Sequence, residues 1–487
     1  MGRVSSPHIL MECLKKQPLY IGGQEVMTEK TVPVYNKETN ETIAEIAVAG
    51  EAECRAAVDA AEKAFREVKL SAYERYEIIL KAANLMRERT EEFAAALSAE
   101  AGKPLRDARG EIGRAYQTLI LSAEEAKRLK GETIPLAGAP GCQNKLAFTI
   151  RQPLGVVCAI TPFNFPVNLA AHKIGPALAA GNTVIYKPAS ATPQTAALLC
   201  DVFREAGLPA GCLNLLTGPG ALVGKYLTKD ARIRMFSFTG SVPVGKSLQE
   251  AAGFRRVALE LGSNSANVVH EDVKDVKKVA ELCAKYAFLN AGQVCISCQR
   301  VYVSRSIYQE FCDYAVAFAK NFKGGKLSDE STCLGPMIAE KEAVRIEGWV
   351  KDAAAAGAKV LTGGHRRGAF YEPTILTDVT PDMDVVKNEA FAPIFSIIPY
   401  DTIEEAIAGV NNSRYGLQAG VFTTSLYIAH YAAEHIEAGG VVINDGSSFR
   451  MDNMPYGGVK DSGMGKEGPE YAIRELTEEK TIIMNFD

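Results

Sequence analysis

The run NAGQVCISC contains a cysteine, Cys295, that could act as a nucleophile. It lies between a helical stretch and the strand candidate QRVYVS, and the small and polar residues around it would leave the thiol facing a cleft. On this position alone, an unreactive buried thiol is the better interpretation, because most free cysteines are buried. Cys298 completes a CxxC pair, but no second CxxC or histidine pair accompanies it, so we expect no metal site.

Three other polar residues change that interpretation. Asn164 in TPFNFP, Lys187 in IYKPAS and Glu260 in LELGS each end or follow a candidate strand. Since the carboxyl ends of parallel strands meet at one edge of a sheet, we expect these side chains to gather there. Cys295 then becomes a candidate nucleophile of the same site.

A different chemistry is suggested by the run FTGSVPVGKS. Gly240, Gly245, Lys246 and Ser247 have the GxxxxGK[ST] spacing of a Walker A motif, so a P-loop nucleotide hydrolase is the alternative function. Pro243 argues against it, because proline removes a backbone N–H donor from the phosphate cradle. On either interpretation, the free N–H groups at the start of the following helix suit a phosphate or pyrophosphate. A second glycine run, TGPGALVG, is better interpreted as a strand-to-helix turn.

The elements that must position these residues follow from hydrophobic periodicity. Residues 51–68 carry apolar side chains at three- and four-residue steps, which predicts a helix, and Ser71 with Glu74 predicts the capping box of the next one. From Leu154 onward, short apolar runs alternate with helical stretches, as is typical of a doubly wound parallel sheet. The strand candidates are LGVVCAIT, NTVIYK, CLNLLT, IRMFSF and RVALEL.

A second α/β series begins near Asn267, so we expect two lobes with a cleft between them. Its strand candidates are QRVYVS, KVLTG, PIFSIIPY, QAGVFT and GVVIND. Residues 146–151 and the stretch KTIIMNF fit neither lobe, and their alternating or strand-like pattern predicts arms. Such arms either join the sheet of another subunit or form an ordinary edge hairpin on their own subunit.

Composition excludes several classes of partner. The 487 residues contain 54 Lys and Arg against 58 Asp and Glu, a balance that disfavours nucleic acid. No apolar run approaches the roughly 18 residues of a membrane-spanning helix, so we expect no membrane partner. The opening MGRVSSPHILMECLKKQPLY lacks a signal-type apolar core, and the eleven cysteines are sparse and odd in number. We therefore expect a cytoplasmic protein with free thiols.

Together with GQVC, the runs TPFNFP, IYKPAS and LELGS resemble the aldehyde dehydrogenase superfamily. The likeness continues through NEAFAPIF, NNSRYGLQAGVF and MPYGGVKDSGMGKEG and so covers nearly the whole chain. It looks closest to the lactaldehyde and short-chain semialdehyde branch. The resemblance implies an α/β fold with a Rossmann-like NAD(P)-binding domain (1–130 and 152–262) and a second α/β, catalytic domain (263–467). It also implies a small β-arm (131–151 and 468–487) that joins subunits into a homodimer or homotetramer.

The resemblance also implies catalytic roles. Cys295 would attack the aldehyde as a thiolate, and the Asn164 amide with the Cys295 backbone N–H would hold the oxyanion. After hydride transfer to NAD or NADP, Glu260 would activate the water that hydrolyses the thioester. The presence of Glu260 argues against the CoA-acylating branch, which typically lacks this base. An ion pair with an arginine is the plainer alternative for Glu260.

The cofactor residues implied by the resemblance bind the ribose, pyrophosphate and nicotinamide. Ser190 stands where relatives strict for NAD commonly carry Glu, so we expect that NADP is accepted or preferred. Departures from the common pattern, such as Ser263 for the usual glycine, remove no reacting group. The full set is Thr161, Pro162, Phe163, Lys187, Ser190, Gly220, Gly240, Ser241, Glu389 and Phe391.

Candidate substrate residues are Arg114, His172 and Arg450, which would bind an anionic tail by charge-assisted hydrogen bonds. The alternative is that Arg114 merely pairs with Glu111, and Arg450 with one of the aspartates at 445 and 452. Val294, where phosphate-handling relatives often have arginine, disfavours glyceraldehyde 3-phosphate. We therefore expect a short polar aldehyde such as lactaldehyde or succinate semialdehyde.

Overall fold

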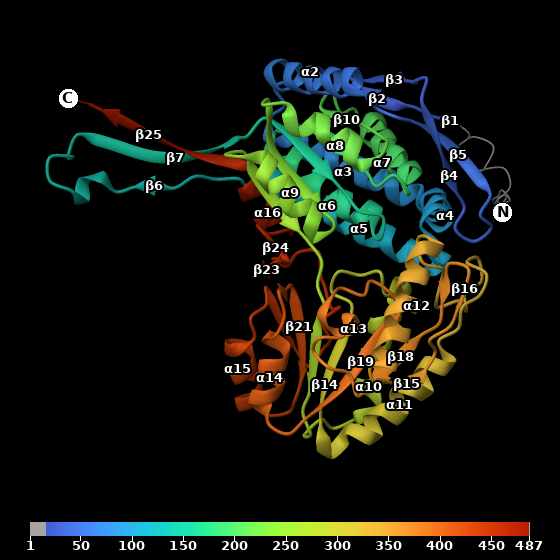
Figure 1. Cartoon of the computed structure of the whole chain (residues 1–487). Coiled ribbons are helices and arrows are strands. Elements are labelled where there is room, and N and C mark those ends of the chain that lie inside the picture. The colour runs from blue at the N-terminus through green and yellow to red at the C-terminus, as the bar shows by residue number, and fades with distance from the viewer. Residues whose placement is uncertain (1–15, 487) are drawn as a thin grey trace, which may run out of the picture.

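The computed structural model describes residues 16–486, which form two lobes and a projecting arm (Figure 1). The N-terminal lobe contains an eight-stranded sheet and the C-terminal lobe a seven-stranded sheet. Residues 1–15, which include most of the stretch used to judge a signal sequence, lie outside the described residues. Within the described part, no helix is long and apolar enough to cross a membrane. The ten cysteines of that part are all unpaired.

The N-terminal sheet has the order β24-β12-β11-β8-β9-β10-β2-β3. Its five central strands are parallel, and all five match the strands expected from the sequence. Chain order runs outward from β8 through β9 and β10, then returns to β11 and β12 on its other side. In such sheets a ligand binds where the strand order reverses, here between β8 and β11. The strands are β2 Leu19–Ile21, β3 Gln24–Val26, β8 Val156–Ile160, β9 Thr183–Lys187, β10 Leu213–Leu215, β11 Ile233–Thr239, β12 Arg256–Glu260 and β24 Gly463–Met464.

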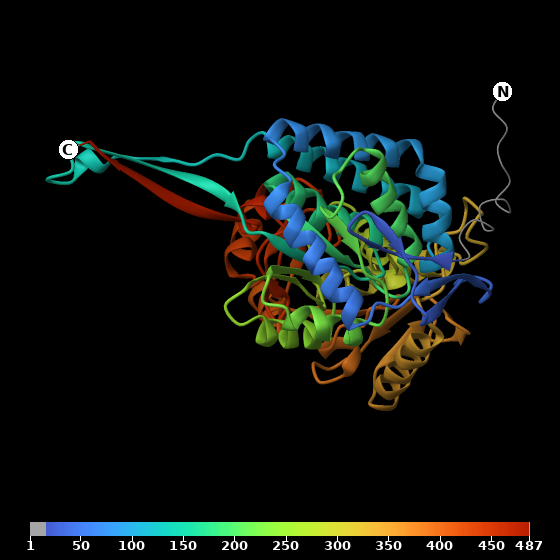
Figure 2. The ribbon, with the colours of Figure 1, turned by 90° about the horizontal axis from the view of Figure 1, so that it is seen from above.

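Helices cover both faces of this sheet (Figures 1 and 2). The capping box is confirmed, since the Ser71 hydroxyl accepts from the Glu74 N–H and the Glu74 carboxylate accepts from the Ser71 N–H. The sequence did not predict a small sheet formed by β1 (Lys16–Gln17), β4 (Thr31–Tyr35) and β5 (Thr42–Ala47). The helices are α2 Glu51–Glu67, α3 Ala72–Glu88, α4 Thr90–Ala101, α5 Leu105–Ala126, α6 Pro166–Ala180, α7 Pro193–Glu205, α8 Gly220–Lys229 and α9 Val242–Ala252.

The C-terminal sheet has the order β15-β18-β19-β14-β13-β21-β22 and is parallel except at its edge strand β15. All five strand candidates of this lobe form strands, although KVLTG becomes the antiparallel edge. The strands are β13 Ala266–Val269, β14 Arg300–Ser304, β15 Lys359–Thr362, β18 Thr374–Thr377, β19 Ile394–Tyr400, β21 Gln418–Phe422 and β22 Gly440–Ile443. The helices are α10 Val276–Phe288, α11 Tyr308–Asn321, α12 Glu340–Ala355, α13 Asp384–Lys387, α14 Ile403–Asn411 and α15 Leu426–His435.

The chain returns from the second lobe to the first before it ends. The short strand β24 adds to β12, where Gly463 lies opposite Glu260, and the helix α16 (Pro469–Glu475) packs on α6. A Cβ on Gly463 would lie 1.9 Å from the Leu259 carbonyl oxygen, so this return strand needs glycine. Two pairs of short strands lie outside the main sheets: β16 Arg366–Arg367 pairs with β17 Phe370–Tyr371, and β20 Tyr415–Gly416 with β23 Val459–Lys460.

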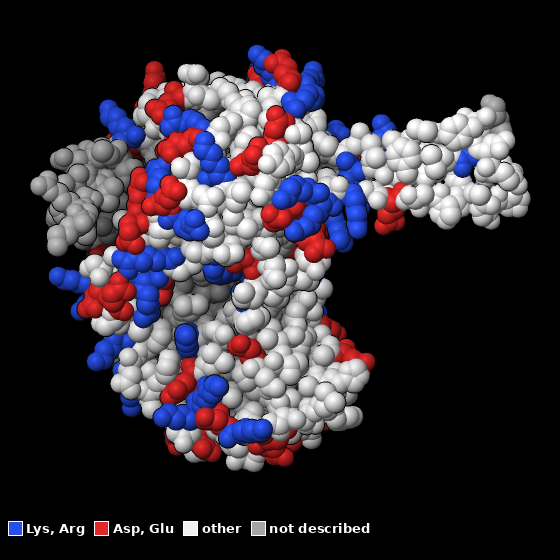
Figure 3. Space-filling model, turned by 180° about the vertical axis from the view of Figure 1, so that it is seen from behind, with Lys and Arg blue, Asp and Glu red and all other residues white. Residues whose placement is uncertain are grey.

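The arm consists of β6 (Thr133–Ile134), β7 (Lys145–Pro153) and β25 (Thr477–Asn485), which project away from both lobes (Figures 1 and 2). The two arm stretches expected from the sequence pair with each other, antiparallel, from Thr477 opposite Pro153 to Asn485 opposite Lys145. Few charges mark the arm in Figure 3, whereas both signs are interspersed over the lobes. Leu146, Ile483 and Met484 expose apolar surface on it.

Candidate active site

A left-handed turn presents Cys295 between α10 and β14. Asn290, Ala291 and Gly292 all have positive φ, at 52°, 55° and 68°. A Cβ on Gly292 would lie 1.9 Å from the Ala392 carbonyl oxygen, so only glycine fits. Because left-handed backbone is unfavourable for the two residues that are not glycine, the surrounding lobe must hold this turn in place.

The Cys295 thiol faces a cavity of about 290 Å³. Its lining includes Arg114, Asn164, Val294, Cys295, Arg450 and Tyr456. The Cys295 Sγ lies 2.9 Å from the Tyr456 hydroxyl oxygen. Burial raises the pKa of Cys295 to about 11, while the Tyr456 hydroxyl and the Arg450 charge act in the opposite direction. The cavity thus brings together the nucleophile, an amide and two arginines.

Asn164 follows β8 and is held on both its side chain and its backbone. Its Nδ2 donates to the Gln293 carbonyl at 2.9 Å, which fixes the orientation of the amide. Its own carbonyl accepts from the buried Lys103 Nζ at 2.8 Å. An amide group carries two N–H donors, so the bond to Gln293 leaves one for a ligand.

Glu260 ends β12 with neither carboxyl oxygen hydrogen-bonded. Its side chain is buried, and this burial raises the pKa well above its ordinary value. The negative charge of Glu467 raises the pKa further, while Lys173 lowers it. A Cβ on Gly457 would lie 2.8 Å from Glu260 Oε1, so the glycine leaves the carboxyl group room. A carboxyl group in a dry site, with its pKa shifted upward, is a stronger general base once it has ionised.

The expected cofactor residues of the N-terminal lobe follow the strands on either side of the switch point. Lys187 ends β9, and residues 161–163 follow β8. The Lys187 Nζ is buried and donates to the Pro188 carbonyl at 2.8 Å, and burial lowers its pKa to about 8. The Cα of Gly220 faces this Nζ, since a Cβ on Gly220 would lie 4.0 Å from it. These features fit a sugar hydroxyl or phosphate oxygen at Lys187.

Gly240 and Ser241 connect β11 to α9, whose N-terminus faces the same edge. Ser241 takes the N-cap position without a capping hydrogen bond from its side chain, which suits a phosphate. Lys246, the lysine of the Walker A spacing, instead pairs with Asp461 at 2.8 Å on an exposed face. The P-loop alternative is therefore not supported. Ser190 lies near this edge and donates to the Gly218 carbonyl.

Two further cofactor candidates reach the cleft from the C-terminal lobe. The ring of Phe391 meets that of Phe163 edge-on, with centroids 5.9 Å apart. Glu389 accepts from the Ser263 N–H at 3.0 Å, and burial raises its pKa to about 7. A Cβ on Gly262 would lie 2.2 Å from the Glu389 carboxylate, so this close approach also needs glycine. Expected cofactor residues of the two lobes thus lie close together at Phe163 and Phe391.

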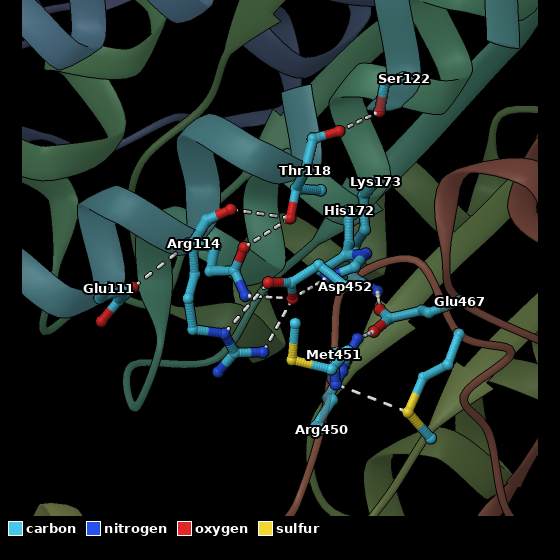
Figure 4. A network of polar contacts seen from close by, with 12 residues as sticks. Glu111, Arg114, Thr118, Ser122, His172, Lys173, Arg450, Met451, Asp452 and Glu467 are labelled. Carbon is cyan, nitrogen blue, oxygen red and sulfur yellow. Dashed lines mark hydrogen bonds and ion pairs between the residues drawn. The ribbon is translucent and has the colours of Figure 1, made fainter. Parts of the chain in front are cut away.

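The substrate candidates occupy a network of ion pairs (Figure 4). Arg114 on α5 binds Asp452 through two hydrogen bonds, of 2.8 and 3.2 Å. Asp452 also accepts from Asn168 at 3.1 Å and lies 2.9 Å from His172 Nε2. The alternative pair of Arg114 with Glu111 does not form, because Glu111 pairs with Lys103. His172 is buried behind Asp452 and is not part of the cavity lining.

Arg450 pairs with neither aspartate of the alternative interpretation. Its Nη2 donates to Glu467 at 2.8 Å, and its guanidinium group stacks 3.7 Å above the Tyr456 ring. Glu467 also accepts from Lys173 at 2.8 Å. The Arg450 Nε is buried and has no hydrogen-bond partner. Arg450 and Lys173 thus share Glu467 and also lie close enough to Glu260 to lower its pKa, so cations and carboxyl groups alternate beside the cavity.

Tyr456, Lys173 and Glu467 were missed as site residues by the sequence analysis. Tyr456 and Glu467 both lie in the run MPYGGVKDSGMGKEG, where their backbones pair with each other. Lys173 directly follows His172. Each of the three residues is polar and lies inside or next to a segment that the sequence analysis had already singled out, and this was the signal that could have identified them. Only the folded chain shows which of these residues face the thiol.

Comparison with known proteins agrees with this geometry. The sequence model of the aldehyde dehydrogenase family matches residues 25–482. The 3-sulfolactaldehyde dehydrogenase of Priestia aryabhattai is 51% identical over 473 residues, which are 97% of this chain and 99% of that protein. The lactaldehyde dehydrogenase of Methanococcus maripaludis is 39% identical over 472 residues, which are 96% and 100% of the two chains.

Solved structures share the whole architecture. Aldehyde dehydrogenase 21 from Physcomitrella patens, in complex with the reaction product succinate, has a TM-score of 0.94 at 39% identity and covers 97% of this chain and 98% of its own. Glyceraldehyde-3-phosphate dehydrogenase from Methanocaldococcus jannaschii, complexed with NADP, has a TM-score of 0.90 at 40% identity and covers 94% and 100%.

Proposed function

Since the chain belongs to the aldehyde dehydrogenase family, we propose that its substrate is a three- or four-carbon aldehyde with an anionic group far from the carbonyl. The chain is an aldehyde dehydrogenase that oxidises small polar aldehydes with NAD or NADP. The expected family, its lactaldehyde branch and the α/β fold are confirmed. The anionic substrate and the residue roles below are our proposal.

Catalysis begins with the Cys295 thiolate, which attacks the aldehyde carbon and places a negative charge on the former carbonyl oxygen. The Asn164 amide stabilises this oxyanion with the N–H that its bond to Gln293 leaves free, and the Cys295 backbone N–H is the second donor. The nicotinamide ring, when bound, accepts hydride. Phe163 and Phe391, whose rings meet edge-on, shape the side of the cleft where that ring would lie.

Glu260 then removes a proton from the water that hydrolyses the thioester. Neither carboxyl oxygen of Glu260 has a hydrogen-bond partner, so either one can accept the proton of that water. The raised pKa makes the carboxylate a stronger base once it has ionised, and Lys173 and Arg450 stabilise its negative charge. Lys187, Gly220, Gly240 and Ser241 bind the ribose and pyrophosphate of the cofactor.

The cofactor preference depends on Ser190. A carboxylate at this position would repel a 2′-phosphate, whereas the Ser190 hydroxyl can turn from the Gly218 carbonyl toward a ligand oxygen. The Lys187 ammonium group is a nearby cation, and a solved relative binds NADP. We therefore propose that NADP is used at least as well as NAD.

The observation that carries the anionic substrate is the unpartnered Nε of Arg450 at the cavity that contains the Cys295 thiol. Glu467 occupies one edge of the guanidinium group and leaves Nε for a ligand. A guanidinium N–H that is buried and free would donate a charge-assisted hydrogen bond to a bound anion. Arg114 lines the same cavity and would supply a second donor.

The names of two relatives support an anionic group on the substrate, and the two names point to different groups. One is named for 3-sulfolactaldehyde, with a sulfonate, and another was solved with succinate, a dicarboxylate. Val294 lines the cavity as an apolar residue, so it adds no cation for a doubly charged phosphate. We propose 3-sulfolactaldehyde and succinate semialdehyde as the first substrates to assay.

The test compares succinate semialdehyde with butanal, which has the same length but no charge. Replacing Arg450 or Arg114 by Gln should lower kcat/KM for succinate semialdehyde by about 1.5–3 kcal/mol, roughly ten- to a hundredfold. Oxidation of butanal should fall much less than that of succinate semialdehyde, because butanal makes no charge-assisted contact with either arginine. Equal losses on both aldehydes would contradict the anionic substrate while leaving the aldehyde dehydrogenase activity in place.

Assembly and location are proposals of the same kind. We propose a homodimer or homotetramer in which a partner subunit covers the apolar residues that the arm exposes. The unpaired cysteines of the described chain agree with a reducing, cytoplasmic location. Sedimentation of the purified enzyme tests the first proposal.

A further inference from the structure

Tyr456 contacts the reacting sulfur atom. Its hydroxyl oxygen lies 2.9 Å from Cys295 Sγ, and its side chain is 3% exposed. The ring packs in an apolar cluster with Val294, Ile296 and Leu417. A phenol hydroxyl in such surroundings is costly unless it is hydrogen-bonded, and the partner that the structure gives it is the nucleophile.

The position of Tyr456 is rigidly determined. Its N–H donates to the Glu467 carbonyl at 3.1 Å, and its carbonyl accepts from the Glu467 N–H at 2.7 Å. The Arg450 guanidinium group covers one face of the ring at 3.7 Å. The hydroxyl is therefore aimed at Sγ by a paired backbone and a stacked cation.

We propose that Tyr456 is a further catalytic residue, whose phenol O–H donates first to the Cys295 thiolate and then to the C2 hydroxyl oxygen of the bound substrate. In the attack, the sulfur lone pair forms the C–S bond and the carbonyl π pair moves to the oxygen. Tyr456 keeps its proton throughout, so the step needs no further reactant. Burial and the neighbouring thiolate raise the pKa of Tyr456 well above its usual value, which agrees with a hydroxyl that stays protonated.

The second half of this proposal rests on the proposed function. With C1 bonded to Cys295 and the anion at Arg450, the carbon chain must run beside the Tyr456 ring, because Arg450 stacks on that ring. Once Sγ is bonded to carbon, it is a poorer hydrogen-bond acceptor than a thiolate. An oxygen on C2 is three bonds from Sγ and hence within reach of the same O–H. Tyr456 would thus favour 2-hydroxy aldehydes over their deoxy analogues.

The first test needs no aldehyde. Tyr456→Phe removes the hydroxyl group and keeps the ring under Arg450. The rate at which iodoacetamide alkylates Cys295 is measured by mass spectrometry, in the variant and in the natural enzyme, from neutral to alkaline pH. The variant should react about three- to tenfold more slowly at neutral pH, because its thiolate loses one donor. Arg450, Glu389 and Glu260 also face the thiol and stay unchanged. Unchanged rates across the pH range would overturn donation to the thiolate.

Tyr400→Phe is the matched control. Tyr400 is equally buried, and its hydroxyl donates to the Val269 carbonyl at 3.3 Å, away from the cavity. We expect its alkylation profile to match that of the unmodified enzyme. A shift as large as that of Tyr456→Phe would show a general effect of losing a buried phenol hydroxyl and would overturn the proposal.

The second test compares lactaldehyde with propanal, which differ only by the C2 hydroxyl group and carry no charge. The ratio of their kcat/KM values should favour lactaldehyde in the natural enzyme and fall about three- to tenfold in Tyr456→Phe. A ratio near one in the natural enzyme, or an unchanged ratio in the variant, would overturn donation to C2. Because neither aldehyde is anionic, this result is distinguishable from a failure of the anion site.

Discussion

The proposed cofactor side of this active site and its proposed substrate side consist of different kinds of groups. On the cofactor side, the ends of β8, β9 and β11 place backbone N–H groups, glycines and one buried lysine at a single sheet edge. On the substrate side, two arginines are held by carboxylates, Arg114 by Asp452, which is 338 positions away, and Arg450 by Glu467, which is 17 positions away. The first side is therefore specified by the strand order, and the second by individual side-chain pairs.

This difference predicts how each side responds to change. A site made by backbone and glycine keeps its shape when one exposed side chain is replaced. A site made by buried ion pairs loses both specificity and stability when one partner is removed, because the other charge is left without its counterpart. The substrate side should thus be the more sensitive to single substitutions.

The largest effect is expected at the nucleophile that serves both sides. Cys295→Ser should lower the rate of aldehyde oxidation by at least about a thousandfold, because an alcohol is hardly ionised at neutral pH. Formation of reduced nicotinamide, followed by absorbance, measures it. Cofactor binding, measured by calorimetry, should stay unchanged, since the cofactor side does not depend on the thiol. Substantial residual oxidation would refute the assignment of Cys295.

Removing the base should separate the two chemical steps. Glu260→Gln should give a burst of about one reduced cofactor per site and then a steady state about a hundredfold slower, since hydrolysis of the thioester loses its base. Stopped-flow absorbance resolves the two phases.

The pH dependence of the natural enzyme provides the accompanying control. The pKa of Glu260 lies well above its ordinary value, so below that pKa the carboxyl group is protonated and inactive as a base. The steady-state rate should therefore rise with pH until the carboxyl group has ionised, when hydrolysis is limiting. A full steady-state rate in Glu260→Gln, or a rate that falls over this range, would rule out the role.

The ion pairs of the substrate side should also carry stability. Asp452→Ala leaves Arg114, Asn168 and His172 without their shared acceptor and should lower the free energy of unfolding by about 2–3 kcal/mol. Guanidinium unfolding followed by the fluorescence of Trp349, the single tryptophan, measures it.

Asp401→Ala is the matched control, because it breaks an exposed pair with Arg305 and should cost about 1 kcal/mol or less. If both variants lose the same stability, the buried pairs contribute no more than exposed ones. The substrate side would then not be more sensitive to single substitutions than the cofactor side.

The smallest effect is expected on the cofactor side. Ser190→Glu should lower kcat/KM for NADP by about tenfold through repulsion of the 2′-phosphate and leave NAD nearly unaffected. Steady-state kinetics with both cofactors provides the measurement. If the natural enzyme already prefers NAD a hundredfold, the proposal for Ser190 is wrong.

The sequence was most informative where local pattern and chain topology decide the structure. Continuous apolar runs correctly predicted the parallel strands, because a strand buried on both faces has no polar alternation. The rule that ligands bind at carboxyl ends then placed Lys187 and Gly240 at one edge. The capping box of Ser71 was predictable because it joins residues only three apart.

Contacts between distant residues were not predictable. Arg114 and Asp452 are 338 positions apart, and nothing in either local run favours this pair over the alternative pair of Arg114 with Glu111. The left-handed conformation of Ala291 depends on packing against the rest of the lobe, because alanine, unlike asparagine, has no preference for this conformation. The short strands of residues 16–47 have too few residues for a clear alternation.

The loop between β22 and β23 carries Arg450, Asp452 and Tyr456 within residues 450–456. One short peptide segment therefore holds the anion contact, the partner of Arg114 and the hydroxyl beside the nucleophile. Amino-acid substitutions in this segment would alter substrate choice and thiol reactivity together. They would leave the proposed cofactor residues unchanged. New substrates in this lineage are expected to arise by exchange of this loop on an unchanged dehydrogenase scaffold.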